Sequence, residues 1–246
     1  MELFWDTIAD YNRNTWVAQG AISLLGAVLV TLLFNRPSPA VKRAMKCYIV
    51  MLNLWIALVY YLYFCHQRPY NYATVLIWLI MAAIWIYDVA TGYTAFERNR
   101  KHERLATLYM LLPLTFPLIS AARGMHYPMM ASPVMPSSVA LFTIGFMLAF
   151  SQRVNLFIVL FLCHWALVGA SKIYAYDIPE DALLACAIVP AIYIPARVCY
   201  VERLCTQQAR PQNGKHTAHN PQRRYGNTLR RPYDSPAAAI TALSPT

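Results

Sequence analysis

Long apolar stretches alternate with short polar or basic segments along most of this chain. Each apolar stretch is about 20 residues long, the length a helix needs to cross a bilayer. The strands of a membrane barrel would instead alternate apolar and polar positions over roughly ten residues. Because lipid offers no partner for charge or for open backbone groups, the pattern predicts an all-α integral membrane bundle.

Seven segments have the composition of a span, within the usual range of roughly 17 to 25 residues. They are 16–34, 47–65, 72–92, 105–122, 136–150, 155–174 and 182–200. The fifth is short, with Pro136 at a natural first helical position. Pro113 and Pro117 predict a kink in the fourth, and Pro190 and Pro195 interrupt the seventh. The count of seven transmembrane helices therefore depends most on the fifth and seventh segments.

These segments divide the chain of 246 residues into three parts. Residues 1–15 form a short outer N-terminal segment, and residues 16–205 form the transmembrane domain. Residues 206–246 are rich in Gln, Asn, Pro, Arg and Ser and have no apolar period, which predicts a disordered basic cytoplasmic tail. No basic region precedes the first apolar stretch, so we expect no cleavable signal peptide.

Composition and charge agree with this organisation. The chain is 58% hydrophobic and only 13% charged, whereas a soluble domain usually carries about 25% charged residues. If the seven spans alternate in direction, 17 of the 21 Lys and Arg residues fall on one side and four on the other. Positive residues favour the cytoplasmic side. The bias therefore predicts an outer N-terminus and a cytoplasmic C-terminus.

The net charge of +10 would suggest a nucleic acid partner in a soluble protein. Here the positive residues flank apolar segments or lie in the tail, so we expect the lipid bilayer as partner and no nucleic acid. The arginine pairs at 223–224 and 230–231 are candidates for contact with anionic lipid headgroups, the alternative being a solvated tail. The oligomeric state is left open.

Ionisable groups at membrane depth are costly, so each is a candidate functional residue. His164 lies near the middle of the sixth segment, where it would shuttle protons, bind a metal or form an interhelical hydrogen bond. Asp88 lies toward the cytoplasmic end of the third segment. It is either a coupling carboxylate or the ion-pair partner of Lys46, Arg98 or Arg153.

Two further polar residues complete a candidate intramembrane polar site of Asp88, His164, Asn53 and Lys172. Asn53 lies inside the second segment, where an amide also serves as packing glue between helices. Lys172 lies near the outer end of the sixth, and we expect its side chain to reach toward Asp177 or Glu180.

Motifs of metal, cofactor and catalytic sites are weak or absent. The six cysteines show no CxxC spacing and read as reduced packing residues. Methionines and a histidine in 123–135 are of the type that binds Cu(I), but no strict spacing recurs. Ser171 has no histidine assignable to it as a nucleophile. We therefore expect no metal and no cofactor, and we assign no catalytic residue.

Three fragments carry a resemblance to a known family. They are Tyr11-Asn12 followed by Trp16 and Gln19, then Gly124 with Tyr127-Pro128, then the stretch PSSVALFTIG at 136–145. Over about residues 5–203 the chain resembles a bacterial family of multi-pass membrane proteins of unknown function, some of which are loosely labelled transporter permeases. The resemblance implies the cytoplasmic membrane of a bacterium and carries no catalytic residues with it.

The chain departs from that family's pattern where the fifth segment begins. Met135 stands where the family tends to have Cys, and serines replace two threonines, so the resemblance implies no thiol chemistry here. It does mark a location: Pro136, Ser137 and Ser138 form a candidate outer helix-terminus site. Unpaired N–H groups at a helix N-terminus attract an anion, although the same residues also suit a plain helix cap.

Three functions remain open from the sequence. Polar residues within spans and proline-broken helices favour transport of a small solute or ion, or a channel-like protein, as the leading hypothesis. The first alternative is a membrane-embedded enzyme acting on a lipid-like substrate, which needs convergent polar residues in a cleft open to lipid. The second is a non-catalytic membrane sensor or partner subunit.

Overall fold

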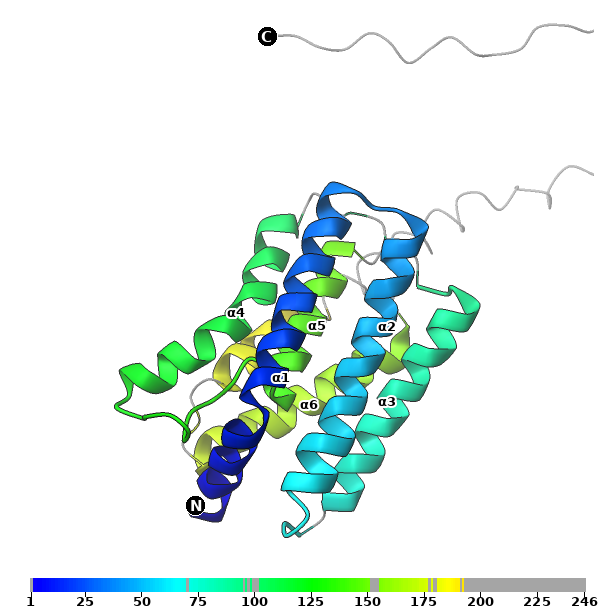
Figure 1. The fold of residues 1–246 in the computed structure, drawn as a ribbon. Helices are drawn as coiled ribbons and strands as arrows, with labels where there is room; N and C mark the ends of the chain where they lie inside the picture. The colour runs from blue at the N-terminus through cyan, green and yellow to red at the C-terminus, as the bar shows by residue number, and fades with distance from the viewer. Residues whose placement is uncertain are drawn as a thin grey trace, which may run out of the picture.

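The computed structural model of the chain describes residues 2–69, 71–94, 96, 98, 102–150, 155–176, 178, 181–190 and 192. This part is helical, without strands (Figure 1), so the predicted all-α class is confirmed for it. The helices are α1 (Glu2–Asn35), α2 (Pro39–Trp55), the π-helix η1 (Ile56–Phe64), α3 (Asn71–Thr91), α4 (Glu103–Ala122), α5 (Pro136–Phe150) and α6 (Leu156–Tyr176). The tail predicted for 206–246 lies outside the described residues.

Five helices are long and apolar enough to cross a membrane, as a helical membrane protein requires. They cover Phe4–Asn35, Pro39–Phe64, Asn71–Thr91, Glu103–Ala122 and Leu156–Ile173. The two remaining predicted segments contain shorter apolar helices, Pro136–Phe150 and Asp181–Pro190. These are the two segments on which the count of seven depends, and that count stays a prediction.

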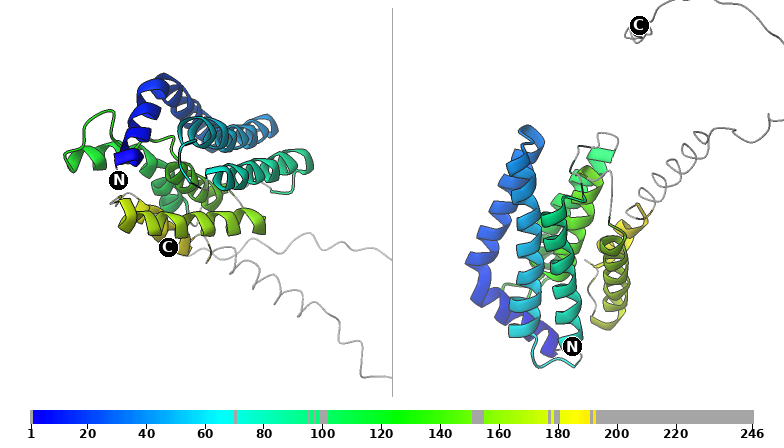
Figure 2. Two further views of the ribbon diagram at one scale, coloured as in Figure 1. Left: turned by 90° about the horizontal axis from the view of Figure 1, so that it is seen from below. Right: turned by 90° about the vertical axis from the view of Figure 1, so that its right-hand side faces the viewer.

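Helix α1 begins at Glu2, well before the span that we predicted to start at Trp16. Its 34 residues correspond to about 51 Å, more than the roughly 30 Å of a bilayer core. Figure 2 shows its N-terminal part turning across the end of the bundle. The hydroxyl of Thr15 donates to the carbonyl of Tyr11 at 2.6 Å, a bond that often bends a helix.

The start of α1 escaped prediction because its apolar residues lie on one face only. Phe4, Ile8 and Tyr11 are buried, at the spacing of an amphipathic helix, while Asp6 and Asp10 between them are exposed. The alternation breaks the continuous apolar run that identifies a span. Residues 2–15 therefore continue the first helix in the structure instead of forming a separate segment.

Helix α2 passes directly into the nine-residue π-helix η1. The Oγ of Ser38 caps the start of α2 by accepting from the backbone N–H of Val41 at 3.2 Å. A π-helix has more residues in each turn than an α-helix, and such segments are often found at functional sites. Two consecutive tyrosines of η1, Tyr60 and Tyr61, are buried.

Helix α5 lies at the centre of the bundle, and 14 of its 15 residues are buried. It packs most extensively against α4. A Cβ on Gly145 would lie 2.7 Å from the backbone nitrogen of Met110 and 2.9 Å from the carbonyl oxygen of Ala106. Glycine therefore lets the two backbones approach, and a helix that is apolar on all sides is suited to this interior position.

Candidate functional site

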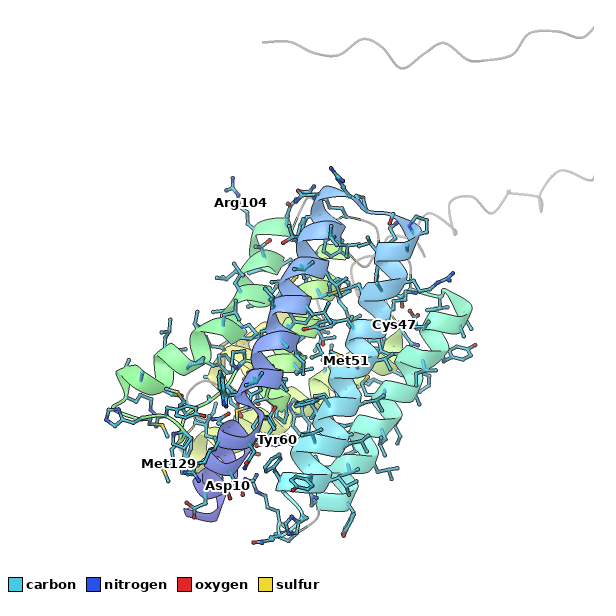
Figure 3. All side chains as sticks on the ribbon, viewed as in Figure 1. Asp10, Cys47, Met51, Tyr60, Arg104 and Met129 are labelled. Carbon is cyan, nitrogen blue, oxygen red and sulfur yellow. The ribbon has the colours of Figure 1, made fainter. Side chains whose placement is uncertain are left out.

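The bundle has two ends, which differ in the segments they carry. The N-terminal end, at the bottom of Figure 1, holds the start of α1, the turn after η1 and the 123–135 loop after α4. Asp10 and Met129 lie there, whereas Arg104 marks the opposite end (Figure 3). The sequence-predicted residues can be placed relative to these two ends.

Asp88 lies near the opposite end and is completely buried. Its Oδ2 is 2.7 Å from the Nζ of Lys46, which is one of the three ion-pair partners considered from the sequence. Its Oδ1 accepts from the backbone nitrogen of Thr94 at 2.8 Å and from the Thr94 hydroxyl at 2.7 Å. Lys46 also lies 5.2 Å from the ring centroid of Phe96. The carboxylate is thus fully engaged with neighbouring residues.

This arrangement holds the connection that follows α3. Gly92 ends the helix with a φ of +66°, a left-handed conformation that favours glycine, and its N–H donates to the Asp88 carbonyl at 2.9 Å. The next residues fold back so that Thr94 reaches the Asp88 carboxylate. Asp88 therefore fixes the chain where α3 ends, and the geometry gives it a structural role.

The other three residues of the predicted polar site have separate surroundings. His164 is exposed on the surface of α6 between the exposed Leu160 and Leu167. Asn53 is buried and donates to the carbonyl of Ile49 in its own helix at 2.7 Å. The Nζ of Lys172 lies 4.8 Å from the ring centroid of Trp165.

The structure does not bring these four residues together. Lys172 lines a small cavity of about 30 Å³ with Phe4 and Tyr60, at the N-terminal end. Asp88 is seventeen residues beyond Asn71 along α3, or about 25 Å toward the opposite end. The two charged groups are therefore separated by most of the bundle.

The candidate helix-terminus site lies beside Lys172. Pro136 and Ser137 line the same small cavity as Lys172 and Asp181. Asp181 supplies the acidic side chain in this cavity, while Asp177 and Glu180, the expected partners of Lys172, lie outside the described residues. The Oγ of Ser138 donates to the carbonyl of Ser132 at 2.8 Å and so holds the preceding loop.

The residues that sequence reasoning undervalued lie where α1 meets the 123–135 loop. The side-chain amide of Asn12 donates to the carbonyls of Pro128 and Met130 at 2.8 and 2.7 Å. The Tyr11 hydroxyl donates to the carbonyl of Val134 at 2.6 Å, and the Tyr127 hydroxyl to that of Asn12 at 3.3 Å. Two fragments that carried the family resemblance, Tyr11-Asn12 and Tyr127-Pro128, are thus in direct contact.

A groove runs between α1 and α4, next to this contact. Helix α1 packs on α2 and η1 and has no comparable packing with α4, from which it diverges toward the N-terminal end (Figure 1). Two cavities of about 310 and 100 Å³ fill the space and share the lining residues Ser23, Leu114 and Pro133. We call them together the α1/α4 groove. Its other lining residues are Asn12, Trp16, Gln19, Gly20, Gly26, Ala27, Val30, Tyr48, Leu52, Met110, Leu111, Pro113, Pro117, Tyr127, Met130, Ala131, Ser132, Val134, Val139 and Phe142.

Both cavities of the groove are largely apolar, and they differ in the polar side chains that line them. Near the N-terminal end its lining includes the polar side chains of Asn12, Gln19 and Ser132. The deeper cavity is lined mainly by apolar side chains, such as Val30 and Phe142. The groove also opens sideways through the apolar surface, since its lining residues Leu111 and Leu114 are 53% and 49% exposed.

Small residues on α1 keep the groove open. Gly20, Ser23 and Ala27 line it at spacings of three and four residues, on one face of the helix. A Cβ on Gly20 would meet nothing within 4 Å, so a larger side chain at this position would enter empty space. At Gly26, in contrast, a Cβ would clash with the Tyr48 hydroxyl.

Metal and acid–base chemistry have little support in the described residues. Within them no group of three or more His, Cys, Asp or Glu side chains is placed to hold a metal ion. Among the described residues, no such side chain and no Lys or Arg lines the α1/α4 groove. The groove therefore offers hydrogen bonds and apolar contact to a ligand.

The comparison with known proteins gives one match. A family model described as "Family of unknown function (DUF6064)" matches residues 1–205, which include every described helix. No curated protein and no solved structure matches the chain.

Proposed function

The chain belongs to the DUF6064 family of unknown function, and we propose that it is a membrane protein that binds one amphiphilic lipid molecule in the α1/α4 groove. The observation that carries the proposal is a largely apolar cavity of about 310 Å³ that has Asn12, Gln19 and Ser132 in its lining, continues into a second apolar cavity and opens sideways. Its volume is in the range of roughly 300 to 1,000 Å³ that is usual for small-molecule sites.

The predicted orientation puts the groove in the outer leaflet. Trp16 and Tyr127 are 64% and 57% exposed at its polar end, where aromatic residues favour the interface between lipid and water. Ala27 lies eleven residues beyond Trp16, or about 16 Å along α1. That distance is close to half of the roughly 30 Å hydrocarbon core.

The groove's two ends match the two ends of an amphiphile. An acyl chain would pack along the small residues of α1 and the leucines of α4, and the head would meet Asn12, Gln19 and Ser132. Leu111 and Leu114 border the side opening, so a lipid would enter from the bilayer without crossing water.

Transport, the leading hypothesis from the sequence, has less support than lipid binding. It required a cavity that reaches Asp88 or His164. Neither residue lines any of the four cavities described for this part of the chain, and Asp88 is closed in by Lys46 and Thr94. None of these four cavities therefore supports a polar route past Asp88 or His164.

Catalysis on a lipid-like substrate also has less support. Convergent polar residues are present in a cleft open to lipid, as that hypothesis required. General acid–base chemistry, however, is usually carried by His, Glu, Asp, Lys, Tyr or Cys close to the reacting atoms. From that set, the described lining of the groove offers only tyrosine, so binding is the function that fits these residues.

The test fills the groove at Gly20. The Gly20→Phe variant places a ring in the empty space beside Gly20, whereas Ala21→Phe places the same ring on the exposed face of α1 outside the groove. Purified full-length protein would be labelled in lipid nanodiscs with a phospholipid that carries a photoactivatable acyl chain. Mass spectrometry would then map the crosslinks.

We expect crosslinks at Ser23, Leu114 and neighbouring groove residues in the unmodified protein and in Ala21→Phe, and their loss in Gly20→Phe. Thermal unfolding of both variants checks that the fold is kept. Equal labelling of the groove in Gly20→Phe and Ala21→Phe, with both proteins folded, would refute the proposed function.

A further inference from the structure

The polar end of the α1/α4 groove points to the chemistry of the lipid head. This inference rests on the proposed function. We infer that the groove selects a lipid with an uncharged head that carries a hydroxyl group, of the diacylglycerol class, over charged phospholipids. Side-chain oxygens that lack a hydrogen-bond donor or acceptor partner, and the absence of charged side chains from the described lining, carry the inference.

The first atom that lacks a partner is the buried hydroxyl of Ser132. This side chain lines the larger cavity, its residue is only 5% exposed, and the hydroxyl has no hydrogen-bond partner among the described residues. The backbone of the same residue is engaged, because its N–H faces the sulfur of Met135 and its carbonyl accepts from Ser138. Buried polar atoms without partners are rare in native proteins, and each one calls for an explanation. Here the explanation is that a polar group of a ligand in the groove pairs with this hydroxyl.

The second atom is the side-chain carbonyl oxygen of Gln19. The Nε2 of Gln19 donates to the hydroxyl of Thr15 at 2.8 Å and to Oδ1 of Asn12 at 3.3 Å, which fixes the amide plane. Within the described part of the chain no residue donates to its Oε1. The groove therefore offers a fixed acceptor from α1 and, from Ser132, a hydroxyl that can donate or accept. A ligand hydroxyl, which also donates and accepts, complements both.

The charge of the groove lining favours uncharged over charged lipid head groups. The part of the lining that the structure describes holds no Lys or Arg that would pair with a phosphate. Arg13 lies one turn before Trp16 but is outside the lining, and its side chain faces Asp10 at 3.5 Å. Burying a phosphate without a counter-charge costs far more than burying a hydroxyl that finds partners. A diacylglycerol hydroxyl can therefore bind beside Gln19 and Ser132, whereas a phosphate group is more stable in water.

The experiment compares the binding of lipids that carry the same acyl chains but different head groups. Full-length protein in phosphatidylcholine nanodiscs would receive equal mole fractions of photoactivatable diacylglycerol, phosphatidylethanolamine or phosphatidylglycerol. We expect diacylglycerol to label the groove roughly fivefold or more over either phospholipid, the ratio that one added hydrogen bond supplies. Equal or stronger labelling by phosphatidylglycerol would overturn the inference.

A matched pair of serine variants separates ligand binding from folding. Ser132→Ala removes the buried hydroxyl, and we expect roughly twofold to tenfold weaker diacylglycerol labelling, together with unchanged or raised thermal stability of the lipid-free protein. Ser137→Ala alters a serine of similar burial outside the groove and should leave labelling unchanged. Unaltered lipid preference in Ser132→Ala would contradict the inference.

The Gly20→Phe variant distinguishes failure of the inference from failure of the proposed function. Labelling by all three lipids that persists in Gly20→Phe would refute the groove as a lipid site. Loss of labelling in Gly20→Phe, combined with equal labelling by the three lipids in the unmodified protein, would keep the groove as a lipid site and refute selection for a neutral head.

Discussion

Replacing Asp88 by alanine tests whether the buried ion pair stabilises the bundle. The substitution removes the carboxylate that lies 2.7 Å from Lys46 and accepts two hydrogen bonds from Thr94. It leaves the Lys46 ammonium, in a residue only 7% exposed, without an opposite charge beside it. Removing one partner of a buried pair typically costs about 3–5 kcal/mol. We expect the free energy of unfolding to fall by that amount.

The double variant Lys46→Met with Asp88→Leu separates pairing from burial. It removes both charges and fills their volume, which for a buried pair is often close to neutral. The backbone N–H of Thr94 still loses its acceptor, so we expect a cost of about 1–3 kcal/mol. Lys46→Met alone leaves the Asp88 carboxylate hydrogen-bonded to Thr94. We therefore expect it to lower the free energy of unfolding by less than Asp88→Ala does.

The assay is reversible unfolding in detergent micelles, followed by circular dichroism, for each single variant and the double variant. We expect the double variant to lose clearly less than the sum of the two single losses, because each single variant leaves a charge unpaired. Additive losses, within about 0.5 kcal/mol, would refute the reasoning and indicate that the two groups are energetically independent.

Three further predictions use the same protein. Gly145→Ala should lower the free energy of unfolding by about 1–3 kcal/mol, because the added Cβ would meet the α4 backbone. Gly20→Ala, whose Cβ meets nothing within 4 Å, should be nearly neutral. Equal effects of the two variants would contradict the close approach of the α4 and α5 backbones. Asn12→Ala should leave the carbonyls of Pro128 and Met130 without their donor and speed proteolysis of the 123–135 loop, and an unchanged cleavage rate would contradict a role in anchoring it. The Cys65 thiol is buried, with its residue only 1% exposed. At pH 8 mass spectrometry should therefore find slow alkylation of Cys65 by iodoacetamide in the folded protein, faster alkylation after unfolding and none in Cys65→Ser. Rapid alkylation at pH 8 would contradict its burial.

The partner of Asp88 could be predicted only in part from the sequence. The cost of a charge at membrane depth predicted that it needs a partner, and Lys46 was among three candidates. Choosing Lys46 required the packing of α2 against α3, which places residues 42 positions apart in contact. The shared site of Asp88, His164, Asn53 and Lys172 stays a prediction. In the structure Asp88 and Lys172 lie near opposite ends of the bundle, as their positions in the third and sixth segments indicate.

The sequence by itself determined that the described chain is helical and that several helices are long and apolar enough to cross a membrane. These properties depend on local composition and on the need to pair backbone groups in lipid, so they can be read one segment at a time. The tertiary structure decided that the short α5 lies in the centre, that Asn12 anchors a distant loop and that α1 diverges from α4 to leave a groove. Those features depend on distances between helices, which arise from the packing of all the side chains together and are not written in any one segment.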